Sequence, residues 1–162
     1  MKAFITTAWR LASDPGLDIQ TLPAPLQRVQ SHLQSLALLA ARLYVAQVFF
    51  ASGLTKLRDW SSTLALFQDV YQVPLLPPVP AAYLGTAGEL ALPVLLVLGL
   101  AGRFAGAGLF VVNLMAVLSL TADDLSPAAL AQHALWGTLA AAIALWGAGR
   151  WSADRVIRGA GN

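Results

Sequence analysis

One long apolar run, residues 81–101, constrains the fold of this chain more than any other feature. It reads AAYLGTAGELALPVLLVLGLA, and about 21 such residues in a helix are enough to cross the hydrocarbon core of a bilayer. A single carboxylate, Glu89, lies near its middle. A carboxylate at that depth is costly unless it is paired, protonated or turned toward a polar interior. The run therefore predicts a membrane-spanning helix with an internal polar site.

Pro93 follows Glu89 by one helical turn. Proline has no N–H for the carbonyl of residue i−4 and its ring crowds that carbonyl, so the pattern predicts a kink beside the carboxylate. Two interpretations of Glu89 stay open at this point. It is either a residue that only joins helices through an interior ion pair, or one that takes part in ligand binding or proton transfer.

The composition of the whole chain is typical of a membrane protein. Of its 162 residues 57% are hydrophobic and 11% are charged, whereas soluble domains carry about 25% charged residues. Cysteine is absent, which excludes thiol–disulfide chemistry and cysteine-held clusters within this chain. The only histidines are His32 and His133, far apart in the sequence, and no metal site is predicted. The net charge of +2 is spread over the helix ends, so no nucleic-acid partner is expected.

Apolar segments of spanning length recur along the chain. They lie at about 36–57, 81–101, 104–120 and 128–146. We therefore predict an all-α fold, an integral membrane four-helix bundle formed by residues 36–162.

A separate N-terminal segment, residues 1–35, precedes the bundle. Its apolar run is too short and too interrupted for a signal peptide. Leu26, Val29 and Leu33 recur at helical spacing among polar residues, which favours an amphipathic segment lying on the membrane surface.

The stretch between the first two spans predicts a lid at the interface. Asp59 or Ser61 can cap a short helix over residues 63–71. Prolines follow this helix, and we expect them to hold the chain extended before the second span. They are Pro74, Pro77, Pro78 and Pro80.

Polar side chains inside the spans define a candidate ligand site. Arg42 and Lys56 share one stripe of the first span with Gly53. Both bases could instead extend toward the membrane surfaces, but an Arg42–Glu89 ion pair is the economical way to satisfy two buried charges. The predicted ligand-binding residues are Glu89, Arg42, Lys56, Asn113 and His133. Residues assigned a structural role in kinking or close helix packing are Pro93, Gly53, Gly102 and Gly106.

The positive residues predict the orientation of the bundle. With four spans both termini lie on one side, and that side carries most of the flanking Lys and Arg residues, against Lys56 and Arg58 on the other. The positive-inside rule then places both termini in the cytoplasm.

Four stretches in order suggest a family: RLYVAQVFFASGLTKLRDW, the F-x5-VP of Phe67 to Pro74, GELALPVLLVLGLAGRFAGAGL and the terminal GAGRWSADR. Together they resemble the DoxX family of small four-helix membrane proteins, from about Leu36 to Arg155. The family takes its name from a membrane subunit associated with quinone-linked sulfur oxidation. The resemblance therefore implies a bacterial inner-membrane protein that partners redox enzymes.

Three functions remain in competition at this stage. The first is an accessory or scaffold subunit of a membrane redox system, with a redox-enzyme partner. The second is an oxidoreductase subunit that binds a quinone or another small apolar ligand around Glu89. The third is a small transporter component, which with four spans requires a homo-oligomer. The sequence assigns no catalytic residue, and quinone is the one cofactor that the resemblance implies.

Overall fold

The computed structural model describes residues 23–121 and 125–159. It divides into two compact units, Met1–Gln34 and Ser35–Asn162. Most of the predicted N-terminal segment, and the acidic pair at residues 123–124, lie outside the described residues.

The described residues form six helices and no strand. These are α2 (Ala24–Arg58), α3 (Trp60–Asp69), α4 (Pro78–Leu98), α5 (Gly102–Leu118), α6 (Pro127–Trp146) and α7 (Ala153–Gly159). The all-α membrane bundle predicted from the sequence is confirmed, although α7 was not expected.

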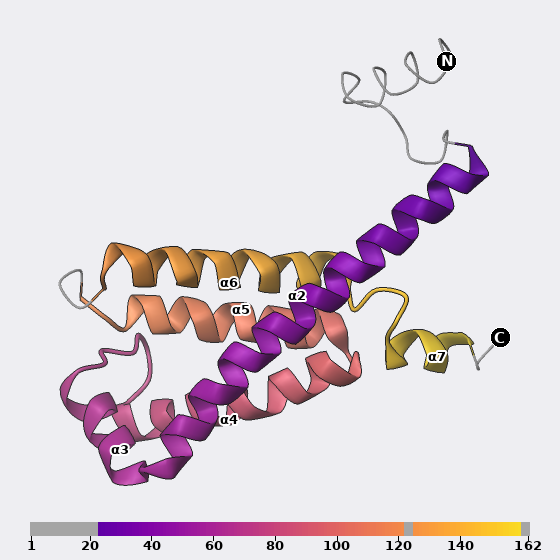
Figure 1. Ribbon diagram of the computed structural model, residues 1–162. Helices are drawn as coiled ribbons and strands as arrows, with labels where there is room; N and C mark the ends of the chain where they lie inside the picture. Colours follow the sequence, from indigo (N-terminus) through magenta and orange to yellow (C-terminus); the bar gives the residue numbers. More distant parts are fainter. Residues whose placement is uncertain (1–22, 122–124, 160–162) are drawn as a thin grey trace. The chain divides into compact units, whose positions relative to one another are not determined.

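Three of these helices, α2, α4 and α6, are long and apolar enough to cross a membrane, and α5 is a shorter apolar helix of 17 residues. In the second unit α5 packs against both α4 and α6, and α3 packs against α4. Successive long helices run in opposite directions, and α2 crosses α5 and α6 obliquely (Figure 1). We call the two ends of the bundle the α3 end and the α7 end, after the short helix found at each.

Apolar side chains from α2, α4, α5 and α6 meet in one core. Val45 and Phe49 of α2, Leu96 of α4, Leu109 of α5 and Ile143 of α6 are buried there. A smaller cluster joins Phe67 of α3 to the first turns of α4. The lipid-facing sides of the helices keep large exposed apolar residues, as expected where the surroundings are lipid tails rather than water.

The short helix α3 begins three residues earlier than the sequence predicts. Its N-cap is Asp59, one of the two candidates, whose Oδ1 accepts a hydrogen bond from the Ser62 amide at 3.0 Å. Hydroxyl donors from Ser61 and Ser62 also reach this carboxylate. These hydrogen bonds lower the pKa of Asp59 to about 2.

The prediction that all four prolines lie in extended chain is wrong for two of them. Pro78 and Pro80 belong to the first turn of α4, and only Pro74 and Pro77 precede it. Proline is tolerated there because the first N–H groups of a helix have no intrahelical partner.

The helix α4 ends three residues before the predicted limit of the second span, at Leu98. Gly99 follows with φ 68°, and its amide donates back to the Leu96 carbonyl. This left-handed residue closes the helix, and α5 then begins at Gly102.

The first unit contributes the beginning of α2. Residues 24–34 are helical, as their spacing indicates, and they are continuous with the first span in a single 35-residue helix. The sequence instead suggested a boundary at Ser35.

Candidate ligand site

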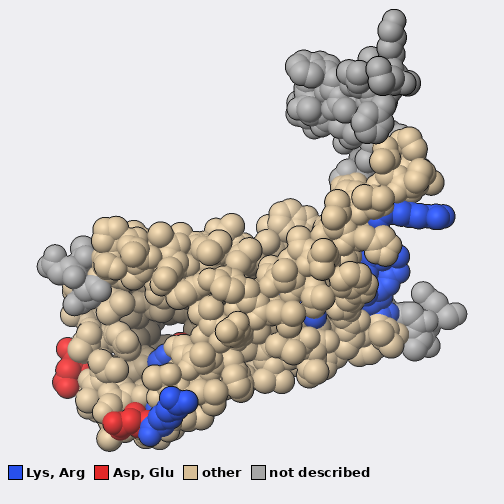
Figure 2. All heavy atoms as spheres, viewed as in Figure 1, with Lys and Arg blue, Asp and Glu red and all other residues tan. Residues whose placement is uncertain are grey.

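A cavity of about 510 Å³ lies in the half of the bundle nearer the α3 end. Its wall is mostly apolar, with Phe49 from α2, Phe67 from α3 and Trp136 from α6 among the larger side chains. Figure 2 shows an opening in the face of the molecule that is turned toward the viewer, with charged atoms at the edge of the opening. The polar side chains that line the cavity are Ser52, Lys56, Tyr71, Glu89, Ser119 and His133.

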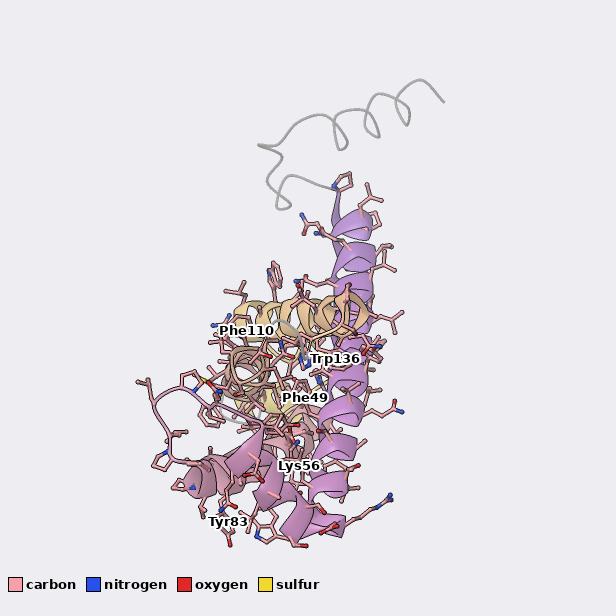
Figure 3. The ribbon with its side chains drawn as sticks, turned by 90° about the vertical axis from the view of Figure 1, so that its left-hand side faces the viewer. Phe49, Lys56, Tyr83, Phe110 and Trp136 are labelled. Carbon is pink, nitrogen blue, oxygen red and sulfur yellow. The ribbon has the colours of Figure 1, made fainter. Side chains whose placement is uncertain are left out.

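An ion pair between α2 and α4 forms part of this wall. Lys56 Nζ lies 2.6 Å from Glu89 Oε2 and 3.0 Å from Ser52 Oγ, to which it donates. The Lys56 side chain is 20% exposed and that of Glu89 10%. Figure 3 shows Phe49 and Lys56 on the side of α2 that faces the other helices.

The ion pair is not saturated. An ammonium has three N–H donors, and two of those on Lys56 are used. In the described part of the chain, Glu89 Oε1 receives no hydrogen bond. One donor and one acceptor therefore remain for an occupant of the cavity.

The predicted Arg42–Glu89 ion pair is wrong. Arg42 is 1% exposed and donates to the carbonyls at the end of α4, to Leu96 at 2.9 Å and to Val97 at 3.2 Å. It also donates to the carbonyls of Ala148 and Trp151. Leu96 is seven residues beyond Glu89, roughly 10 Å along the helix, so Arg42 and Glu89 occupy different parts of the bundle.

Arg42 thereby closes the C-terminal end of α4. The last carbonyls of a helix have no intrahelical donors, and a cation is favoured at the negative end of the helix dipole. The planar fork of the guanidinium suits several acceptors at once. The residue belongs to the framework of the α7 end and does not line the cavity.

Asp154 is a polar residue that the sequence reasoning missed as a helix cap. Its carboxylate accepts from the amides of Ala101 at 2.8 Å and Gly102 at 2.9 Å, at the start of α5. Its own amide donates to the carbonyl of Gly99. The helix N-terminus favours a negative charge, so Arg42 and Asp154 together fix the α4–α5 turn. The cap lies more than fifty residues away in sequence, and only the GAGRWSADR ending hinted at it.

His133 and Asn113 form a reciprocal pair between α6 and α5. Asn113 Nδ2 donates to the carbonyl of His133, and Asn113 Oδ1 lies 2.9 Å from His133 Nδ1. Because Oδ1 can only accept, the network assigns the proton to Nδ1 and leaves Nε2 as an acceptor. His133 lines the cavity, whereas Asn113 is buried behind it.

The residues expected to shape helix packing lie at close approaches. A Cβ on Gly53 would meet Leu90 at 2.9 Å and Glu89 Cβ at 3.2 Å, beside the ion pair. Gly102 faces Ala148, and Gly106 faces the backbone of α6. Pro93 lies within α4, and its side chain is buried in the bundle.

Tyr71 contributes a hydroxyl to the cavity from the loop after α3. Its ring meets Phe67 edge-to-face at 5.0 Å between centroids. Burial, and then the negative charge of Glu89, raise the pKa of this tyrosine. Tyr71 therefore stays neutral at physiological pH.

This arrangement can bind a small molecule that is mostly apolar and has a polar end. Its donors and acceptors lie on one part of an otherwise apolar wall, as is usual in ligand pockets. Among the described residues no three His, Asp or Glu side chains are grouped as metal ligands.

The fold and the polar interior define the chain as a multi-pass helical membrane protein. The DoxX family model matches residues 37–122, which is more than half of the chain. The chain belongs to the DoxX family. No curated protein and no solved structure matches it.

Proposed function

We propose that this chain is a membrane subunit that holds a small, largely apolar molecule in the α3-end cavity and supports a membrane redox system. The observation that carries the proposal is the unsaturated Lys56–Glu89 ion pair on the wall of an apolar cavity. A buried charge pair costs desolvation energy, and elsewhere in the bundle Arg42 is satisfied by backbone alone. The spare hydrogen-bonding capacity supports binding as the role of the pair.

A quinone is the ligand class that fits both the cavity and the resemblance to the family. Its ring and tail are apolar and its carbonyl oxygens accept hydrogen bonds, so Lys56 can donate to it. In the quinol form its hydroxyl groups can donate to Glu89 or to His133 Nε2. The chain here binds and orients, and a partner enzyme supplies the electron transfer.

The test is extraction of bound small molecules from protein purified in nanodiscs, with a visible absorption spectrum and mass spectrometry. We expect a stoichiometric quinone in the native protein and its loss in Glu89→Gln. Asp69→Asn is the matched control, because Asp69 is an exposed carboxylate outside the cavity, and it should retain the quinone. A native protein without a bound small molecule contradicts the proposal.

A scaffold role is the second candidate, and the loop after α3 favours it. Leu75 has φ 66° and is 97% exposed, an unusual position for a large apolar side chain. Such a residue at a loop tip suits the docking of a partner subunit. Capture of a redox partner by the native chain, and its loss in Leu75→Asn while quinone retention is kept, would favour this role, because Leu75 does not line the cavity.

The proposed location is the bacterial inner membrane, with both termini in the cytoplasm. Among the described residues the α7 end carries exposed Arg103, Arg150 and Arg155, whereas the α3 end combines Arg58 with Asp59 and Asp69. This asymmetry supports the orientation under the positive-inside rule. Because the chain has no cysteine, single cysteines at Arg58 and Arg155 can be labelled from either side of the membrane. Labelling of position 155 from outside the cell contradicts the orientation.

A further inference from the structure

The apolar side chains at the edge of the cavity face out of the bundle. Leu84 of α4 and Val111 of α5 both line the cavity, and they are 60% and 50% exposed. Leu76, from the loop after α3, also lines it and is 40% exposed. We call Leu76, Leu84 and Val111 the mouth of the cavity.

The two helical residues of the mouth, Leu84 and Val111, lie within the depth of the membrane. Leu84 is six residues after the first residue of α4, and Val111 is seven before the last residue of α5. At 1.5 Å per residue both positions are roughly 10 Å inside their helix ends. The exposed sides of these helices face lipid, so the mouth meets hydrocarbon at Leu84 and Val111, and Leu76 from the loop completes its edge.

The charges inside the cavity select among membrane-dissolved molecules. The Lys56–Glu89 ion pair has no net charge. Because Lys56 Nζ and Glu89 Oε2 are 2.6 Å apart, a head group that binds to one of them also lies near the other. An anionic head group is repelled by the carboxylate of Glu89, and a cationic head group is repelled by the ammonium of Lys56. An uncharged head group can accept from Lys56 and donate to Glu89 Oε1 or His133 Nε2 without either repulsion.

We infer that the cavity is loaded sideways from the bilayer, through the mouth, by an uncharged membrane-dissolved molecule whose head group carries a carbonyl or hydroxyl oxygen. This inference rests on the proposed function and narrows its ligand. It separates such molecules from phospholipids and ionised fatty acids, which share their apolar tails but carry charge. It also separates them from water-soluble molecules, which reach the protein from outside the bilayer.

The test uses three photoreactive probes with one diazirine-bearing alkyl chain and different heads: an alcohol, a sulfonate and a trimethylammonium. Each is dissolved in nanodiscs that hold the full chain, and labelled residues are identified by mass spectrometry. We expect the alcohol to label cavity residues at least about tenfold more than either charged probe, because a charge inside a membrane is costly without a partner. Labelling of the cavity by the sulfonate or the ammonium at the alcohol's level overturns the inference and leaves the proposed function standing.

Two variants sharpen the head-group test. Glu89→Gln leaves Lys56 as a lone cation, so preference should move toward the sulfonate. Lys56→Met leaves Glu89 as a lone anion, so labelling of the cavity by the trimethylammonium probe should rise relative to the other two probes. An unchanged order of the three probes in folded protein shows that the ion pair does not select the head group, and overturns that part of the inference.

Sideways loading is tested by filling the mouth. Leu84→Trp together with Val111→Trp should slow labelling of the cavity by the alcohol about tenfold or more, since a large obstruction of a narrow path acts on the rate of association. Leu118→Trp is the matched control, because Leu118 is an exposed residue of α5 that does not line the cavity. Equal labelling rates in both variants overturn sideways loading. Absence of cavity labelling by all three probes in the native protein overturns the proposed function as well.

Discussion

Two basic residues of the same helix have different kinds of partner in this molecule. Arg42 and Lys56 lie fourteen residues apart on α2, and both point into the bundle. Arg42 is almost wholly buried and directs its donors to four backbone carbonyls. Lys56 meets one carboxylate and one hydroxyl, and its third N–H has no partner among residues 23–121 and 125–159. The partners of a buried charge therefore distinguish a residue that supports the framework, as Arg42 does, from one for which a ligand-binding role is proposed, as for Lys56.

The chemistry of the two side chains matches these roles. A guanidinium is a rigid fork that stays charged and can satisfy several fixed acceptors, whereas an ammonium is a compact charge on a flexible stem. At the α7 end Arg42 accordingly binds the last carbonyls of α4, and Asp154 caps the start of α5. At the α3 end, Lys56 and Glu89 keep hydrogen-bonding capacity among the described residues, which suits the proposed ligand.

The largest effect is expected at Arg42. Arg42→Met should lower the free energy of unfolding by about 3 kcal/mol or more, because it leaves buried carbonyls without donors. Arg42→Lys should restore little of this stability, because a single ammonium nitrogen cannot reach the carbonyls of α4 and those of Ala148 and Trp151 at once. Thermal unfolding in a mild detergent measures both. Arg58→Gln, an exposed base at the end of the same helix, is the control and should change little.

A smaller loss is expected at Gly53, where α2 approaches α4. Gly53→Ala places a methyl group 2.9 Å from Leu90 and 3.2 Å from Glu89 Cβ, and overpacking of this kind costs about 1–3 kcal/mol. The same change should weaken ligand retention, because it pushes Lys56 away from Glu89. Gly85→Ala meets its nearest neighbour, Phe67, only at 3.7 Å and should keep full stability. Equal stability of the two variants contradicts the close approach.

The helix cap at Asp154 predicts a further, moderate effect. Asp154→Ala removes both hydrogen bonds to the start of α5, and loss of such a cap costs about 1 kcal/mol. The loss should appear in thermal stability and leave retention of the cavity ligand unchanged. Loss of the ligand in folded Asp154→Ala would show that the two ends of the bundle are coupled.

The smallest effect concerns pH. The folded-state pKa of Tyr71 is raised by burial and by Glu89, so its contribution to stability is fully present below the unfolded pKa of about 10. It is lost as the pH rises above that value toward the folded-state pKa. Tyr71→Phe should therefore flatten the alkaline decline of the melting temperature. An alkaline decline equally steep in Tyr71→Phe and in the native protein would contradict the prediction.

The sequence was sufficient for features that depend on local pattern. Spanning length predicted the bundle, and the residue types after α2 predicted Asp59 as a candidate cap. The cavity-lining residues Lys56, Glu89 and His133 were all chosen from their depth within the spans.

The sequence could not choose the partner of each charge. The Arg42–Glu89 pairing followed from the cost of two buried charges, but Glu89 is paired with Lys56 and Arg42 donates to the carbonyls of α4. Arg42 also binds backbone carbonyls as far as Ala148 and Trp151. Such acceptors occur at every residue, so a side-chain pattern cannot indicate them.

The most direct test of the account is the double variant Lys56→Met with Glu89→Gln, measured for folded yield, melting temperature and retained quinone. Because both charges are removed together, this variant leaves neither Lys56 nor Glu89 as an unpaired charge inside the bundle. The difference between its change in stability and the sum of the changes in the two single variants measures the coupling of the pair. We predict a folded bundle with nearly native melting temperature and no bound quinone. A folded double variant that retains quinone like the native protein would contradict the claim that this ion pair serves the ligand rather than the fold.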